Sequence, residues 1–174
     1  MVLETPRLIL RPFRRKDVDL LAKLMKNRDF MRFSLGVHTR EQTIAFLEKI
    51  LSWDEAGSPS QFAVIFRENS ELIGYCGFFR QIVDGKNEIE IGYRLHPDYR
   101  NRGLATEAAN AVRDHSIHDL KINRVISLIH PDNAASRRVG EKIGMRLEKE
   151  TVFKGFPAQV FSLAREQSLS QRGA

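Results

Sequence analysis

The stretch Arg100-Asn101-Arg102-Gly103-Leu104-Ala105 joins a segment with the pattern of a β-strand to a segment with the pattern of a helix. Glycine lets the backbone come close to a ligand. The first turn of a helix presents free N–H groups that carry partial positive charge. Together with two arginines, this turn is a candidate phosphate site. Taken alone, the pattern also fits a solvated basic loop that caps a helix.

The residues on both sides of this turn predict a strand–turn–helix–strand unit. Between Asn87 and Leu95, apolar residues at every second position predict a strand with one apolar face. Pro97 ends this strand, since proline cannot donate to a sheet ladder. Arg124–Ile129 reads as a second strand, so the unit predicts a crossover between parallel strands. The apolar residues of the intervening helix recur at helical spacing, at Leu104, Ala105, Ala108, Ala109 and Val112.

The rest of the chain predicts a mixed α/β domain. Two amphipathic helices are expected early in the chain, and a capping box of Thr39 and Gln42 starts the second. The buried stripes of these helices are expected to be Leu20, Leu21, Leu24 and Met25 in the first, and Ile44, Phe46, Leu47, Ile50 and Leu51 in the second. The helices are predicted at Asp17–Asn27 and Arg40–Trp53, and the remaining strands at Leu8–Leu10, Gln61–Arg67, Glu71–Val83, Arg146–Phe153 and Ala158–Ala164, with a hairpin turn at Asp84-Gly85.

Length and composition indicate one compact enzyme domain. The chain has 174 residues, of which 42% are hydrophobic, and we expect a single domain over residues 1–165 followed by a polar, frayed tail at 166–174. It has no apolar run near the length of a transmembrane helix and no signal-peptide pattern at its start, which favours the cytoplasm. Its one cysteine, Cys76, excludes internal disulfides and is expected to be a buried filler rather than a nucleophile.

The net charge of +6 favours anionic partners, such as a phosphorylated cofactor, nucleic acid or the ribosome. The positive charge is spread along the chain, and the pairs Arg100/Arg102 and Arg137/Arg138 are the candidate cofactor contacts. The sequence shows no basic sheet interleaved with aromatic residues, which argues against direct nucleic-acid binding. His115 and His118 share a helix face without a third ligand, so no metal site is expected.

Several blocks in the same order resemble the GNAT N-acetyltransferases over nearly the whole chain. The strand followed by Arg-x-x-Gly-x-Ala and Thr106-Glu107-Ala108 is similar to the acetyl-CoA-binding core of that family. The segment from His130 to Met145 resembles its later block, in which an Asn and a Ser open a helix. The start, Thr5–Phe13, is similar to the RimJ/RimL branch. The resemblance implies a mainly antiparallel sheet of about seven strands, with a central parallel pair splayed around acetyl-CoA and about four flanking helices.

The same resemblance implies the path of the cofactor. Pantetheine amides would pair with backbone near Tyr93 and Leu95, where an N–H group would also polarise the thioester carbonyl. The pyrophosphate would lie on N–H groups of the turn into the helix. Asn133 would hydrogen-bond or orient the pantetheine, although its position also suits a simple helix cap. The implied cofactor-binding residues are Tyr93, Leu95, Arg100, Arg102, Gly103, Leu104, Ala105, Thr106, Asn133 and Ser136.

Two residues are candidates for proton transfer. Glu90 matches the family's general base, two residues before Gly92, where no side chain should crowd an approaching ligand; the alternative is that Glu88 and Glu90 form the polar face of a half-buried strand. Ser136 matches the acid proposed for the thiolate in the RimJ/RimL branch. Many relatives place a Tyr acid at the position of Gly140, which excludes that acid here.

The resemblance therefore predicts an acetyl-CoA-dependent N-acetyltransferase whose acceptor is a primary amine. The RimJ/RimL branch favours the N-terminal α-amine of a protein or peptide, for example a ribosomal protein. A small-molecule amine such as a polyamine, an amino acid or an antibiotic is the alternative acceptor. A non-catalytic ribosome- or RNA-binding module, or a CoA-binding regulator without activity, is the alternative of another class. The sequence leaves the choice between monomer and homodimer open. We expect the residues that select the acceptor to lie in the two early helices and the last hairpin.

Overall fold

An eight-stranded sheet forms the centre of the computed structural model, which describes residues 1–166. The strand order is β1-β2-β3-β4-β5-β6-β8-β7, and every neighbouring pair is antiparallel except the parallel pair β5 and β6. The strands are β1 (Leu3–Glu4), β2 (Leu8–Pro12), β3 (Gln61–Phe66), β4 (Glu71–Val83), β5 (Lys86–Leu95), β6 (Arg124–Ile129), β7 (Arg146–Phe153) and β8 (Phe156–Ala164). The predicted mixed fold and its parallel pair are confirmed.

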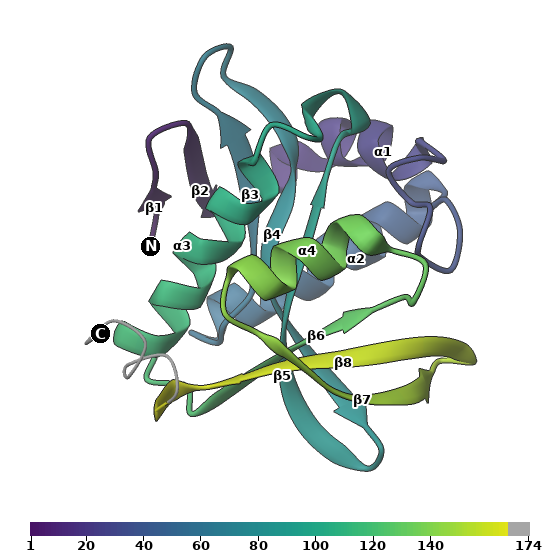
Figure 1. Cartoon of the computed structure of the whole chain (residues 1–174). Coiled ribbons are helices and arrows are strands. Elements are labelled where there is room, and N and C mark those ends of the chain that lie inside the picture. Colours follow the sequence, from purple (N-terminus) through teal and green to yellow (C-terminus); the bar gives the residue numbers. More distant parts are fainter. Residues whose placement is uncertain (167–174) are drawn as a thin grey trace.

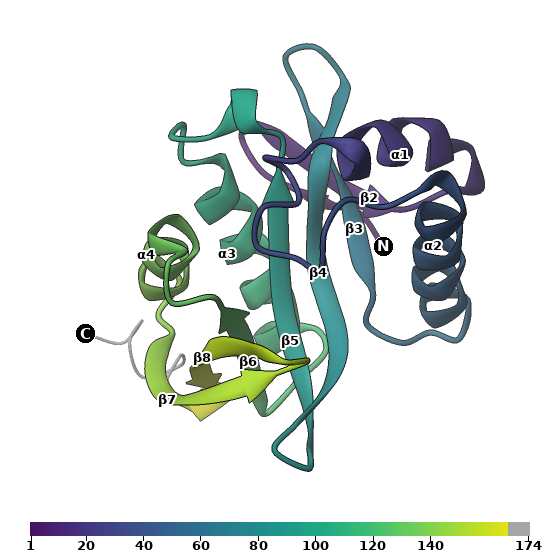
Figure 2. The same cartoon turned by 90° about the vertical axis from the view of Figure 1, so that its right-hand side faces the viewer.

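Two pairs of helices cover the two faces of the sheet (Figures 1 and 2). Helices α1 (Val18–Lys26) and α2 (Arg40–Glu55) lie on one face, and α3 (Leu104–His118) and α4 (Ala134–Lys142) lie on the other. Short 3-10 turns precede α1 at Arg15–Asp17 and α3 at Pro97–Tyr99. Each face has its own apolar core, because side chains of one strand point alternately to opposite faces.

The motif strand β5 is covered on both sides. Ile91 and Leu95 are buried in the core under α3, while Tyr75 and Phe79 of the neighbouring strand pack in the core under α1 and α2. Glu90 is therefore not on a solvated strand face, and only 9% of it is exposed. The predicted apolar face of this strand is confirmed, because Ile89, Ile91, Tyr93 and Leu95 all pack in the core under α3. The alternative that Glu90 belongs to a half-solvated polar face does not hold, because helices flank both faces.

The early helices begin where the sequence predicts. The Thr39 side chain accepts a hydrogen bond from the backbone N–H of Gln42, and the Gln42 side chain accepts one from the N–H of Thr39, which confirms the capping box. Leu20 and Ile44 were expected in the buried stripes, but they are 51% and 41% exposed. Adjacent residues point about 100° apart around the helix axis. The buried positions beside Leu20 and Ile44 are Leu21, which the stripe already included, and Thr43, which it did not.

The strand β1 is the eighth strand, which the sequence did not predict. It has two residues and pairs Leu3 with Leu10 of β2, so it is too short to carry a periodic pattern. The last strand begins at Phe156, before the predicted Ala158, because the turn consists of Lys154 and Gly155, both at positive φ. The predicted polar tail lies outside the described residues from position 167 onward.

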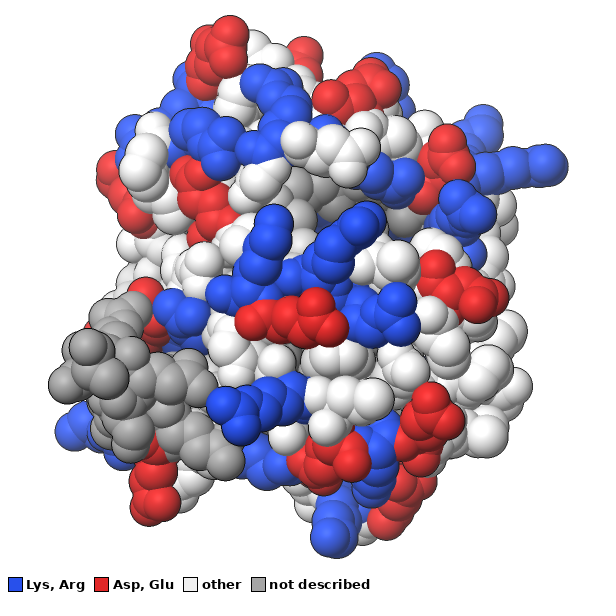
Figure 3. Space-filling model, viewed as in Figure 1, with Lys and Arg blue, Asp and Glu red and all other residues white. Residues whose placement is uncertain are grey.

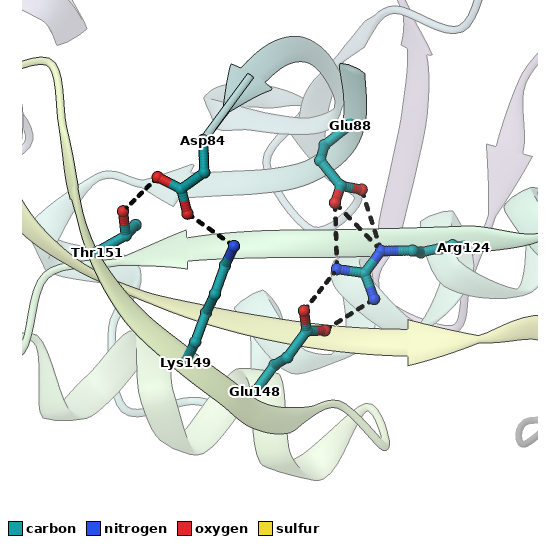
Figure 4. Close-up of polar contacts among 6 residues, drawn as sticks. All are labelled: Asp84, Glu88, Arg124, Glu148, Lys149 and Thr151. Atoms are coloured by element: carbon teal, nitrogen blue, oxygen red, sulfur yellow. Dashed lines mark hydrogen bonds and ion pairs between the residues drawn. The ribbon is translucent and has the colours of Figure 1, made fainter. Parts of the chain in front are cut away.

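The parallel strands β5 and β6 are paired at one position, Glu90 with Ile126, and they separate beyond it. At the start of the pair, the Arg124 guanidinium lies between the carboxylates of Glu88 and Glu148, at 3.1 and 2.8 Å (Figure 4). Asp84, in the β4–β5 turn, bonds Lys149 and Thr151 of β7, each at 2.7 Å. Polar contacts thus hold one end of the pair closed. Within residues 1–166, no helix is both long and apolar enough to cross a membrane.

Candidate active site

A cleft of about 730 Å³ opens where β5 and β6 separate. Its walls come from the second half of β5, the turn into α3, the first turns of α4, and the connection between α1 and α2. In the opening, the Ser127 hydroxyl donates a 2.7 Å hydrogen bond to the carbonyl oxygen of Ile91. A side chain thus links the two strands where their backbones no longer pair.

The glycine turn forms one end of the cleft. Gly103 precedes α3 at φ +75°, a left-handed conformation that favours glycine. Leu104, Ala105 and Thr106, which form the first turn of α3, line the cleft, and N–H groups in a first helical turn have no partner within the helix. Arg100 lines the cleft and its Nη2 donates to the carbonyl of Asp29 at 2.7 Å.

Arg102 is the predicted site residue whose side chain is directed elsewhere. Its guanidinium lies over the rings of Phe66 and Tyr99, 4.8 and 5.6 Å from their centres. It lines a second, smaller cavity together with Arg7, and it is not part of the main cleft wall. Stacking on these two rings, which come from β3 and from the 3-10 turn, draws the side chain away from the cleft.

The first turn of α4 forms the opposite wall. Asn133 caps the helix, because its Oδ1 accepts the backbone N–H of Ser136 at 3.1 Å, and both residues also line the cleft. Lys and Arg side chains gather over α4 beside a hollow in the surface (Figure 3). Of the α4 cations, Arg138 and Lys142 line the cleft, and Arg137 does not.

Tyr93 crosses from β5 to α4. Its hydroxyl donates to the carbonyl oxygen of Ser136 at 2.7 Å. Gly140, one turn later on the helix, is buried against Ile129 and Phe161. Both Tyr93 and Leu95 line the cleft, as the sequence places them.

Glu90 lies at the bottom of the cleft. Its Oε2 accepts a 2.7 Å hydrogen bond from Gln81 Nε2, and its Oε1 lies 3.5 Å from the backbone N–H of Leu128 on β6. Burial raises the pKa of the Glu90 carboxyl above its ordinary value, and the two hydrogen bonds oppose part of this rise. A carboxyl with a raised pKa is a better proton acceptor when ionised, which suits a general base.

An aromatic wall on the α1/α2 side was missed by the sequence reasoning. It consists of Phe30 and Phe33 from the connection between α1 and α2, and Tyr75 and Phe79 from β4, all lining the cleft. The expectation that the two helices themselves and the last hairpin supply these residues does not match the cleft lining. The run Phe30-Met-Arg-Phe33, aromatic within a connecting segment, was the available signal.

The surface above Gly92 is not open. A Cβ placed on Gly92 would lie 2.7 Å from Cε2 of Phe79, so this ring covers the glycine. The expectation that no side chain crowds this position is therefore wrong. Gly92 and Phe79 lie on adjacent antiparallel strands, two residues out of register and therefore on the same face of the sheet, and the missing side chain of the glycine leaves the space that the ring fills.

The cleft fits a long ligand with an anionic end. The end near α3 and α4 combines two helix N-termini with Arg100, Arg138 and Lys142, which suits phosphates. The middle runs along strand β5, whose backbone is without a strand partner on the β6 side past the Glu90 pairing among the described residues. Within residues 1–166, no group of three His, Cys, Asp or Glu side chains could hold a metal ion.

Cys76 lies away from this chemistry. It is fully buried in the core beneath α3, and burial raises the pKa of its thiol. The prediction of a buried filler is confirmed.

Comparison with known proteins gives the family. The family profile of the acetyltransferase (GNAT) domain matches residues 7–146. The uncharacterized N-acetyltransferase YnaD of Bacillus subtilis (strain 168) is 33% identical over 159 residues, which cover 89% of this chain and 90% of YnaD. The ribosomal-protein-serine acetyltransferase of Escherichia coli (strain K12) is 28% identical over 129 residues, or 72% of this chain and 70% of that protein.

Solved structures agree with this family assignment. A GNAT-family acetyltransferase from Bacillus anthracis matches with a TM-score of 0.80 at 30% identity, covering 95% of this chain and 99% of that chain. The ribosomal L7/L12 α-N-protein acetyltransferase RimL, solved with coenzyme A, shares the fold with a TM-score of 0.79 at 19% identity, covering 94% of this chain and 98% of that chain. The chain therefore belongs to the GNAT family and is an N-acetyltransferase that uses acetyl-CoA.

Proposed function

We propose that this enzyme acetylates the N-terminal α-amine of a protein or peptide. The observation that carries the proposal is the position of Glu90, a buried carboxyl that lines the cleft and is paired across the strands with Phe79 of the aromatic wall. Support for a protein acceptor comes from the E. coli relative, whose name gives a ribosomal protein as its substrate, and from the N-terminal block of the sequence. A cytoplasmic location is part of the same proposal.

The cofactor would be held by the residues that line the cleft. The pyrophosphate would lie on the N–H groups of Leu104, Ala105 and Thr106, with Arg100 beside it. The pantetheine would follow β5 at Tyr93 and Leu95, and its thioester supplies the acetyl group. A backbone N–H of β5 would donate to the thioester carbonyl and stabilise negative charge on its oxygen.

Glu90 and Ser136 would divide the proton transfers. The Glu90 carboxylate accepts a proton from the attacking amine, directly or through a water, while the amine nitrogen forms a bond to the carbonyl carbon. As the carbon–sulfur bond breaks, the Ser136 hydroxyl donates a proton to the thiolate. At pH 7 about 0.04% of a lysine side chain is in its neutral form, compared with about 10% of an α-amine. A single carboxylate base can therefore deprotonate an α-amine more easily than a lysine.

The test is one peptide that carries a free N-terminus and an internal lysine. Incubated with acetyl-CoA and the enzyme, it should gain a single acetyl group at the N-terminus, as located by fragmentation mass spectrometry. A peptide with a blocked N-terminus is the matched control and should remain unmodified. Acetylation mainly at lysine, or turnover of a polyamine or aminoglycoside with no peptide product, would instead establish the small-molecule or side-chain acceptor.

A further inference from the structure

Arg94 presents a positive charge to the acceptor half of the cleft. It follows Glu90 by four residues on β5, an even number, so both side chains leave the same face of the sheet. Its Nη1 donates to the carbonyl oxygen of Phe30 at 3.1 Å and lies 3.4 Å from Met31 Sδ. These contacts use one of its two terminal nitrogens and hold the guanidinium against the aromatic wall.

No carboxylate pairs with Arg94 among residues 1–166. Three other partly buried arginines do have such partners: Arg11 bonds Asp17, Arg113 bonds Asp114, and Arg124 bonds Glu88 and Glu148. Arg94 interacts with the Glu90 carboxyl electrostatically but forms no ion pair with it. A guanidinium presents its N–H groups as a rigid fork that matches a carboxylate.

The other charged groups of this half of the cleft are few. Arg32, stacked 5.4 Å from the centre of the Phe33 ring, and Asp29 line it, and both are exposed. Glu90 is its buried acid. An acceptor with several positive charges would face two arginines here, and repulsion between like charges disfavours it.

The spacing limits where the anion sits on the acceptor. Residues four apart in a strand are separated by about 13 Å, and one residue of extended peptide spans about 3.3–3.6 Å. With its amine at Glu90, an extended peptide would therefore bring the side chain of its third or fourth residue to Arg94.

We infer that Arg94 forms an anion subsite that selects N-termini with an acidic side chain at the third or fourth position. This inference rests on the proposed function. It makes the enzyme selective between peptides that share the same α-amine chemistry, since only a side chain a few residues from the amine differs.

The experiment compares three peptides that differ at position four, where they carry Asp, Asn or Lys. For the wild-type enzyme, kcat/KM should be about tenfold or more higher for Asp than for Asn, the scale of a charge-assisted hydrogen bond, and lowest for Lys. In Arg94→Gln the Asp/Asn ratio should fall to about one, while the KM for acetyl-CoA stays unchanged. Arg94→Lys should restore part of the ratio, because it keeps the charge but loses the fork.

Arg80→Gln is the matched control. Arg80 is an exposed arginine on β4, stacked 5.7 Å from the centre of the Trp53 ring and outside the cleft wall. It should leave the Asp/Asn ratio unchanged. A ratio is the chosen readout because loosening the Phe30 contact would slow all three peptides equally.

The outcomes separate this inference from the proposed function. Equal rates for the three peptides, or an Asp/Asn ratio that survives Arg94→Gln, would overturn the subsite and leave the α-amine assignment standing. If no peptide is acetylated, the proposed function fails, and a polyamine then serves as the acceptor. Turnover of the polyamine in place of all three peptides would overturn the subsite as well.

Discussion

The hydroxyl of Tyr93 on β5 donates a 2.7 Å hydrogen bond to the carbonyl oxygen of Ser136 in the first turn of α4. This contact joins the two walls of the cleft at the level where the parallel strands have separated. Burial raises the pKa of Tyr93, so the phenol remains a protonated donor throughout the physiological range. Tyr93 thus holds Ser136, the residue proposed as the acid, through the backbone carbonyl of Ser136.

Removing this hydroxyl should loosen the α4 wall. Tyr93→Phe keeps the ring but leaves the Ser136 carbonyl without this donor, so the free energy of unfolding should fall by about 1 kcal/mol. The value of kcat should fall as well, because Ser136 is less well positioned. Urea denaturation and steady-state kinetics measure both, and a variant that matches the wild type in stability and kcat would show that the contact has no role.

Ser136→Ala tests the proton donor. The value of kcat should fall about 10- to 1000-fold with little change in the KM for acetyl-CoA, because the hydroxyl acts in the transition state rather than in binding. Release of free thiol gives the rate. An unchanged kcat would mean that the thiolate leaves without help from this residue.

Gly103→Glu tests the phosphate end of the cleft. The new carboxylate would repel the pyrophosphate, and affinity for coenzyme A should fall by about tenfold or more. Gly85→Glu is a matched control, because Gly85 has the same φ of +75° in the hairpin turn, with open space around it and no place in the cleft. Both variants carry similar backbone strain, about 1–2 kcal/mol. Calorimetric titration with coenzyme A should distinguish them, and equal affinities would contradict the site.

Glu90→Gln should change both activity and stability with pH. Gln cannot accept a proton, so kcat should fall and the remaining activity should shift to higher pH, where more of the amine is neutral. Because burial raises the pKa of Glu90 in the folded state, its contribution to stability is full below the unfolded pKa and is lost as pH rises through the folded pKa. The variant should therefore gain stability relative to wild type as pH rises above the ordinary carboxyl pKa of about 4.3, as measured by denaturation; a constant difference would argue against the raised pKa.

The ion pair of Arg11 and Asp17 gives a prediction for acid stability. Burial alone would raise the pKa of Asp17, but hydrogen bonds from Arg11 and from the Arg14 N–H outweigh it, and the pKa is lowered. Its stabilising contribution is therefore present above the unfolded pKa and lost as pH falls through the folded pKa. Asp17→Ala should cost about 3–5 kcal/mol at pH 7 and less below about pH 4. Asp19→Ala, which removes an exposed partner of Arg40, should have little effect at either pH.

Local sequence signals predicted the parts of the fold that local chemistry decides. Asp84 and Gly85 adopt the positive φ values of 47° and 75° that a two-residue hairpin needs, and Thr39 caps its helix as expected. Local signals did not predict the parallel pairing at Glu90 or the place of Asn133 and Ser136 in the cleft wall. These predictions depended on the order of motifs along the chain, which resembles that of a known family.

The features that the sequence did not predict depend on contacts between distant segments. Phe79 covers Gly92 because two strands are paired in one register, and Arg102 turns away because two rings from other elements lie beside it. The aromatic wall is built by a connection whose path is set by helix packing. Pattern and spacing carry no information on such placements.

The Glu88–Arg124–Glu148 contacts in Figure 4 give the cleft a mechanical asymmetry. At the paired end of β5 and β6, one guanidinium joins two carboxylates, whereas at the separated end a neutral hydrogen bond joins Tyr93 to Ser136. Ionised hydrogen-bonding groups form stronger contacts than neutral ones. The separated end is therefore the weaker of these two joints, and it is the end at which a long ligand can enter between the strands.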